Sequence, residues 1–163
     1  MIVILRLSCS SLEKGKPLRF LSIRVPTNEE NYMKHDKFIG LVQNRARLPS
    51  RGDAELATKA TLQTLCERLA GGEAKDLASQ LPPLLADYAL SGEAGSGECF
   101  GLNEFFQRVS DREKADLPQA IFDSRAVISV LQEAVTKGEI NDIRSQLPPE
   151  YDRLFEAGAS GEM

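Results

Sequence analysis

Apolar residues in two stretches of the chain repeat with the period of an α-helix. The first stretch spaces them at i, i+3, i+4 and i+7, which places all four on one helical face: Leu62, Leu65, Cys66 and Leu69. The second stretch marks the same face with Ile128, Leu131 and Val135. These patterns predict helices over about 53–70 and 117–136, and they predict that Cys66 is a small buried side chain.

Glycine and proline residues predict where these and the neighbouring helices end. Gly72 and Gly138 follow the two apolar stretches, at points where a left-handed residue would end a helix. Pro82 and Pro148 come next and disfavour helix at the residue before them. Short helices are therefore expected between each glycine and proline. Six further helices are expected. Four are placed at about 34–47, 73–80, 102–113 and 139–146, and the last two begin at Pro83 and Pro149.

The chain contains an internal repeat. Residues 60–83 align without a gap with residues 126–149, and 11 of the 24 aligned residues are identical. No stretch alternates apolar and polar residues with β-branched enrichment, so no sheet is expected. The predicted fold class is therefore all-α: two tandem homologous helical units of about four helices each, at 33–90 and 102–156. We expect the units to bury their apolar faces against each other as a pseudo-two-fold helical bundle.

Three segments lie outside the two units. Residues 1–32 have no counterpart in the repeat, and Met33 opens a segment that resembles a protein start, so 1–32 is interpreted as a disordered extension or a mis-assigned start. The apolar run that begins at Met1 is far shorter than the ~20 residues that a membrane span needs. Residues 91–101 are interpreted as a flexible Gly-rich linker, and 157–163 as a disordered tail.

Composition and charge narrow the class of protein. Hydrophobic residues make up 42% of the chain and charged residues 27%, which is typical of a globular domain. Residues 33–163 contain 15 Lys and Arg against 21 Asp and Glu, a balance that disfavours nucleic-acid binding. The three cysteines show no CxxC spacing, which indicates a reducing compartment. We expect a cytoplasmic protein that binds neither nucleic acid nor membranes.

Candidate catalytic and metal-binding residues are few. His35 is the only histidine, and we expect it to be exposed at the start of a helix. A zinc site or a Ser–His–Asp triad is therefore not expected. The sequence contains no P-loop, HExxH or GxSxG pattern. It predicts a protein that is not an enzyme and has no cofactor, catalytic residue or metal ligand.

Four pairs of polar residues are identical at aligned positions of the two units: Arg45 with Arg112, Glu67 with Glu133, Asp76 with Asp142, and Gln80 with Gln146. The arginines lie in last helical turns, where a cation suits the helix dipole and can bind terminal carbonyls. The acids could pair with these arginines, and the glutamines could satisfy backbone groups near the proline breaks. A structural role is favoured for all four pairs. Arg45 and Arg112 are also the candidates for contact with an anion or a partner.

The chain resembles a bacterial family of unknown function, DUF2267. The resemblance is carried by MKHDKFIGLVQNRA, by the 60–83 run ATLQTLCERLAGGEAKDLASQLPP, and by the closing segment RAVISVLQEAVTKGEINDIRSQLPPEYDRLF. It covers about three quarters of the chain and leaves out residues 1–32. It implies a helical protein, and it implies no activity and no functional residue.

Three functional hypotheses follow. The first is a helical module that binds a protein partner or a second copy of itself. The second is a regulatory protein that binds a small ligand or anion in the cleft between the two units, where Arg45 and Arg112 could grip it. The third is an enzyme with an unusual carboxylate site. The character of that cleft, apolar and closed or polar and open, is the structural observation that separates these hypotheses best.

Overall fold

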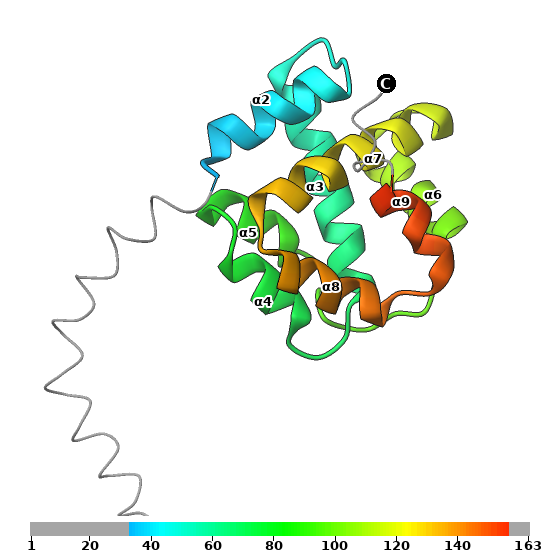
Figure 1. Ribbon diagram of the computed structural model, residues 1–163. Helices are drawn as coiled ribbons and strands as arrows, with labels where there is room; N and C mark the ends of the chain where they lie inside the picture. The colour runs from blue at the N-terminus through cyan, green and yellow to red at the C-terminus, as the bar shows by residue number, and fades with distance from the viewer. Residues whose placement is uncertain (1–32, 157–163) are drawn as a thin grey trace, which may run out of the picture. The chain divides into compact units, whose positions relative to one another are not determined.

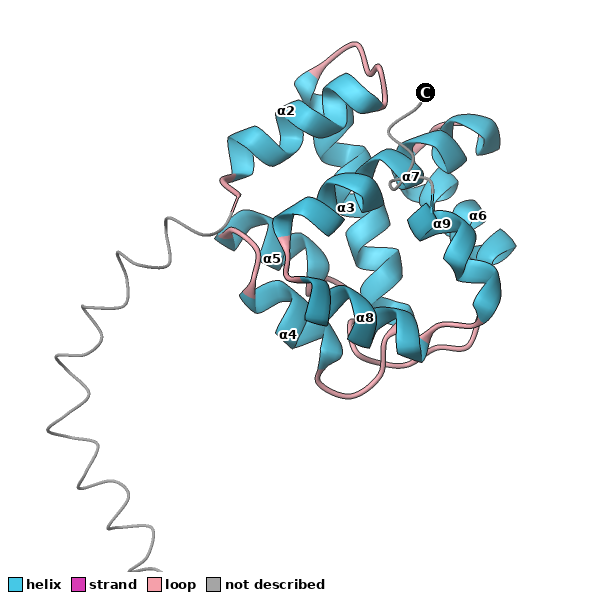
Figure 2. Ribbon diagram, viewed as in Figure 1, coloured by secondary structure: helices cyan, strands magenta, loops and turns pink. Residues whose placement is uncertain are grey.

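The computed structural model describes residues 33–156, and the expectations for 1–32 and 157–163 lie outside this range. The described residues form helices joined by loops, with no strand among them, which confirms the all-α part of the predicted fold class (Figure 2). Eight α-helices and one 3-10 turn follow one another: α2 His35–Arg45, α3 Arg51–Arg68, α4 Glu73–Ser79, α5 Pro83–Ala89, α6 Leu102–Glu113, α7 Leu117–Ala134, α8 Lys137–Gln146, η1 Pro149–Tyr151 and α9 Asp152–Glu156.

Helix α3 lies in the middle of the described bundle (Figure 1). It contacts α2, α5, α6 and α7, and α7 in turn contacts α2, α6 and α9. The apolar face predicted for α3 is fully buried: Leu62, Leu65, Cys66 and Leu69 are each 0% exposed. Burial, with a smaller contribution from the charge of Glu67, raises the pKa of the Cys66 thiol to about 12. Cys66 is thus a core side chain, as predicted.

The two long helices begin with the same kind of cap. The Ser50 hydroxyl accepts a hydrogen bond from the Asp53 amide at 3.1 Å, and the Asp116 carboxylate accepts one from the Gln119 amide at 2.9 Å. Such a side chain satisfies one of the free amides of a first helical turn. The caps set the starts of α3 and α7, and the predicted start of α3 at about 53 was two residues late.

The prediction that Gly72 and Gly138 are left-handed helix ends is wrong. Gly71 is the left-handed residue in the first half, with φ 67°, and Gly72 directly precedes α4. Gly138 lies inside the first turn of α8. The halves differ because the Thr136 hydroxyl caps α8, accepting from the Glu139 amide at 3.3 Å, whereas the aligned residue in the first half is alanine.

Residues 91–101 are attached to the end of α3, unlike the flexible linker expected from their composition. The amides of Gly95, Gly97 and Glu98 donate to carbonyls of the last residues of α3 and its C-cap, at 2.7–3.0 Å. These carbonyls have no partner inside their own helix. Gly97 has φ 68°, and a Cβ there would lie 2.9 Å from the Cβ of Ala70, so this close approach requires glycine. The segment therefore caps a helix.

Two glutamines join α4 and α8 to the opposite half of the bundle. Gln80 accepts from the Thr136 amide, and Gln146 accepts from the Ala70 amide, both at 2.8 Å. Gln80 also donates to Glu139 at 3.0 Å. The expectation that these glutamines satisfy backbone groups near their own proline breaks was therefore wrong. They satisfy amides that follow α3 and α7.

Candidate functional site

A cleft of about 310 Å³ opens between the α2–α3 corner and the α6–α7 corner. One wall comes from residues 47–56 and the other from residues 113–123, so both halves of the chain contribute. The lining residues are mostly polar or charged, and the cleft is open to solvent: Arg47, Leu48, Pro49, Asp53, Leu56, Glu113, Lys114, Ala115, Gln119 and Asp123.

The two corners that bound the cleft have the same backbone conformation. Arg47 follows α2 with φ 55°, and Lys114 follows α6 with φ 60°. A left-handed residue ends a helix and turns the chain sharply. Both of these residues carry long cationic side chains in place of the usual glycine, and both are exposed. The sharp turns therefore set two cations at the edge of the cleft.

Two buried acids lie on the α6–α7 side of the cleft. Glu113 is 9% exposed, Asp123 is 2% exposed, and neither carboxylate oxygen of Glu113 has a hydrogen-bond partner among the described residues. Burial and the nearby Asp123 charge raise the pKa of Glu113 to about 8. Burial also raises the pKa of Asp123 to about 6, opposed by a 2.7 Å hydrogen bond from Nε2 of the Gln119 side chain. The pair therefore holds a proton near neutral pH.

The sequence carries a signal for these acids that the prediction missed. The apolar face of α6 runs through Phe105, Phe106 and Val109, and Glu113 occupies the next position of that face. The repeat aligns Glu113 with Ala46 and Asp123 with Ala57, both of which are buried. Packing does not require a carboxyl group on a buried face where the other copy has alanine. Such a residue is therefore a signal that the sequence offers.

The predicted site residues, Arg45 and Arg112, do not line the cleft. Arg45 donates to Ser129 at 2.9 Å and pairs with Glu133. Arg112 donates to Thr64 at 2.7 Å and to both carboxylate oxygens of Glu67, at 2.7 and 2.9 Å. Each arginine thus joins its own half to an acid of the other half. Their contact with an external anion or partner stays an untested prediction.

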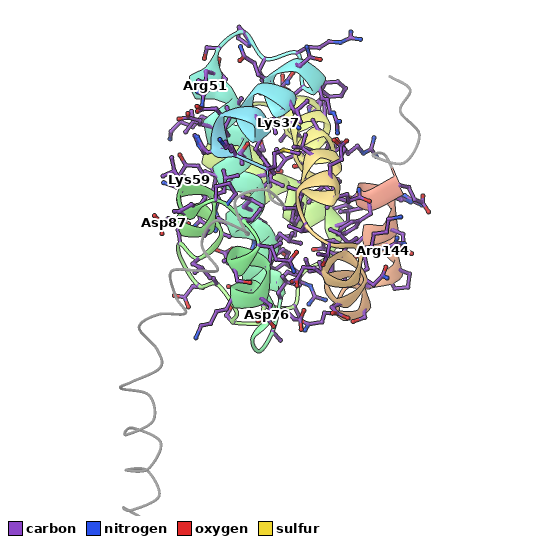
Figure 3. All side chains as sticks on the ribbon, turned by 60° about the vertical axis from the view of Figure 1, so that its left-hand side comes forward. Lys37, Arg51, Lys59, Asp76, Asp87 and Arg144 are labelled. Carbon is purple, nitrogen blue, oxygen red and sulfur yellow. The ribbon has the colours of Figure 1, made fainter. Side chains whose placement is uncertain are left out.

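The remaining polar candidates lie elsewhere. His35 is 21% exposed in its side chain, and its Nε2 is buried without a partner among the described residues, so the expected exposed histidine is half-buried. Asp76 lies on α4 at the lower edge of the bundle in the view of Figure 3. The predicted pairing of arginines with Glu67 and Glu133 is confirmed, and no ion pair of Asp76 or Asp142 occurs among residues 33–156.

Two further findings concern residues 33–156 as a whole. No three His, Cys, Asp or Glu side chains of this range gather closely enough to hold a metal ion. No helix in this range combines the length and the apolar character that crossing a bilayer requires.

The family of the chain is decided by a sequence match that spans both halves. The family described as an uncharacterized conserved protein, DUF2267, matches residues 35–154. The chain is a member of DUF2267. The match begins at the first residue of α2 and ends within α9, so the cleft and both Arg–Glu pairs belong to the DUF2267 region. A comparison with curated proteins gave no match.

Proposed function

We propose that this DUF2267 protein is a non-enzymatic regulatory module that binds a small polar ligand in the cleft between its two halves. The observation that carries the proposal is Glu113, a carboxyl group in the cleft wall that is 9% exposed and has no partner for either oxygen among residues 33–156. A buried polar group without a partner costs about 1–3 kcal/mol. A ligand that donates hydrogen bonds to Glu113 would recover that free energy.

The cleft also has the other properties of a ligand site. It is concave, it is formed by two sets of helices, and it combines apolar and polar lining residues. Its lining residues include no serine, threonine, cysteine or histidine, so they offer no hydroxyl, thiol or imidazole nucleophile. Its polar and open character supports ligand binding more than closure against a partner.

We further propose that the two halves are copies of one unit related by a pseudo-two-fold axis. The support is a set of reciprocal contacts between aligned residues. Arg45 contacts Glu133 while Arg112 contacts Glu67. Gln80 and Gln146 likewise bind the amides of Thr136 and Ala70, which are themselves aligned. In such an arrangement the cleft lies where the two equivalent corners meet.

A ligand screen with two matched variants tests the proposed function. Thermal shift is measured against carboxylates, amines, amino acids, sugars and phosphates, and binding to the native state raises the melting temperature. Leu56 lines the cleft and Leu84 does not, and they are 51% and 44% exposed. We expect Leu56→Trp to fill the cleft and abolish the shift, while Leu84→Trp preserves it. The proposal fails if no class binds, or if both variants bind equally.

A carboxylate enzyme is the second candidate, and the Glu113–Asp123 pair favours it. Two acids whose pKa values are raised to about 8 and about 6 resemble the acid and base of a proton-transfer site. Prolonged incubation of bound ligands with the protein, followed by NMR of the ligand pool, distinguishes the two. Unchanged ligands support a binding module, and turnover that Asp123→Asn abolishes supports the enzyme.

The partner-binding hypothesis stays a prediction. Light scattering at several concentrations tests self-association of the full chain. A second copy that buries the cleft would keep ligands out of it, so the wild-type protein would show no thermal shift for Leu56→Trp to abolish. The two hypotheses therefore give different results.

A further inference from the structure

The cleft contains two kinds of charge at different depths. Glu113 and Asp123 are buried on the α6–α7 side, while Arg47 and Lys114 are exposed at the two corners. Neither cation forms an ion pair with another described residue. Asp53 of α3, also in the lining, is partly exposed and accepts a hydrogen bond from Ser50 at 2.7 Å. Residues with buried carboxyl groups and residues with exposed cations thus line one cavity.

The first half of the chain has no acids at the positions that align with Glu113 and Asp123. Ala46 and Ala57 occupy the aligned positions of the first half and are buried there, so the helix corner packs without a carboxyl group. Two carboxyl groups that lose hydration on burial lower the stability of the folded chain. Only one half of the chain has this loss of stability, which points to a role of the two acids other than packing.

The unpartnered oxygens of Glu113 favour a ligand group that donates hydrogen bonds and carries positive charge. An ammonium group has three donors and no acceptor, and a buried charge stays stable only when it is paired. The exposed guanidinium of Arg47 and ammonium of Lys114 favour the opposite, a carboxylate. Leu48, Pro49 and Leu56 add apolar surface to the lining.

We propose that the cleft binds a small zwitterion of the α-amino-acid class, with its ammonium group at Glu113 and Asp123 and its carboxylate at Arg47 and Lys114. An apolar side chain of the ligand packs against Leu48 and Leu56. This assignment rests on the proposed function and adds the chemical class of the ligand.

Binding of the ammonium group changes the protonation of the pair. The raised pKa of Glu113, about 8, keeps a proton on this carboxyl group at neutral pH in the empty cleft. The ammonium group stabilises the ionised carboxylate, so the proton leaves Glu113 for the buffer. The charged groups that share the lining with Glu113 are Arg47, Asp53, Lys114 and Asp123. A zwitterion therefore binds with release of up to about one proton.

Matched ligands test the charge requirement on the full-length protein. After a screen of the common amino acids, leucine is compared with 3-methylbutylamine, which lacks the carboxylate, and 4-methylpentanoate, which lacks the ammonium group. Calorimetry is expected to show leucine, or the best amino acid, binding at least about tenfold more tightly than either analogue, since one charge pair is lost in each case. Equal binding of an analogue overturns the zwitterion assignment.

Variants test the residues. Glu113→Gln is expected to weaken amino-acid binding at least about tenfold and to abolish the proton release, which is measured as the difference in binding enthalpy between phosphate and Tris buffers. Asp87→Asn is the control, because Asp87 projects from the outer face of α5 and does not line the cleft (Figure 3). Lys114→Gln changes an exposed residue and is expected to reduce the preference for leucine over 3-methylbutylamine.

The outcomes separate this inference from the proposed function. Binding of sugars, phosphates or single-charge analogues in the cleft, blocked by Leu56→Trp, overturns the zwitterion assignment and leaves the proposed function standing. Absence of binding by every class overturns both. Amino-acid binding that is unaffected by Glu113→Gln and Lys114→Gln places the ligand elsewhere and overturns both.

Discussion

The two Arg–Glu pairs that join the halves use aligned residues in different environments. Glu67 is 4% exposed in its side chain and receives two hydrogen bonds from Arg112, whereas Glu133 is 50% exposed in its pair with Arg45. An exposed ion pair contributes about 0–1 kcal/mol, because water screens it, while loss of one partner from a buried pair costs about 3–5 kcal/mol. Identical residues in two copies therefore need not contribute equally to stability.

The largest expected effect is the loss of the buried pair. Arg112→Met leaves the buried carboxylate of Glu67 with only Arg108, whose Nη1 is 3.4 Å away. We expect the free energy of unfolding to fall by about 3–5 kcal/mol, and by at most about 1 kcal/mol for the matched Arg45→Met. Urea unfolding measures both. Equal losses would mean that the two pairs are equally buried in solution.

A core substitution in each half sharpens this comparison. Leu65 and Leu131 are aligned, and both are 0% exposed. Leu65→Ala and Leu131→Ala should each lower the free energy of unfolding by about 2–5 kcal/mol through the cavity they leave. Similar losses would show that the halves differ in their polar contacts and share an equivalent core. A loss below about 1 kcal/mol at either position would contradict the packing.

The buried acid makes the stability of the wild type depend on pH. The pKa of Glu113 is raised to about 8 in the folded chain from an ordinary value of 4.5. The stabilisation by its bound proton is complete below the unfolded pKa and is lost as the pH rises through about 8. Glu113→Gln should therefore be more stable than the wild type at pH 9, by on the order of 2 kcal/mol. Urea unfolding at several pH values checks this, and a constant difference between wild type and variant would contradict it.

The smallest expected effect concerns the glutamines. Gln80 makes two hydrogen bonds across the halves, and Gln146 is aligned with it but makes one. Gln80→Ala should cost about 1–2 kcal/mol and Gln146→Ala about 1 kcal/mol. Hydrogen exchange adds a local readout, since each variant should deprotect the amide that its glutamine covers, Thr136 or Ala70. Deprotection of the other amide would contradict the contacts.

Much of the fold was predictable because it is encoded locally. The i, i+3, i+4, i+7 spacing in α3 and the prolines before α5 and η1 set helices within a few residues of their observed bounds. The start of α8 was misjudged because the Thr136 hydroxyl caps this helix, whereas the first half has a left-handed glycine, Gly71, before α4. A helix cap of this kind depends on a single side chain, so the spacing of apolar residues gives little sign of it.

The candidate site was less predictable than the fold. The partners of Arg45 and Arg112 were anticipated, because the acids Glu133 and Glu67 repeat with them. A cleft between the two units was anticipated, but its lining residues were not, because its walls come from segments about 60 residues apart in sequence, 47–56 and 113–123. The place of Glu113 on the apolar face of α6 signals its burial, but its proximity to Asp123 depends on how α6 packs against α7, which no local pattern specifies.

The attachment of residues 91–101 to α3 affects how the molecule can come apart. Once Gly95, Gly97 and Glu98 release their carbonyl partners, the last turn of α3 loses its cap, and Glu67, which holds Arg112, lies in that turn. Residues 91–101, which connect the two halves, therefore also stabilise the end of α3, the helix on which both halves depend. The halves should melt together in one cooperative transition, and an insertion at 95–98 should loosen the whole assembly.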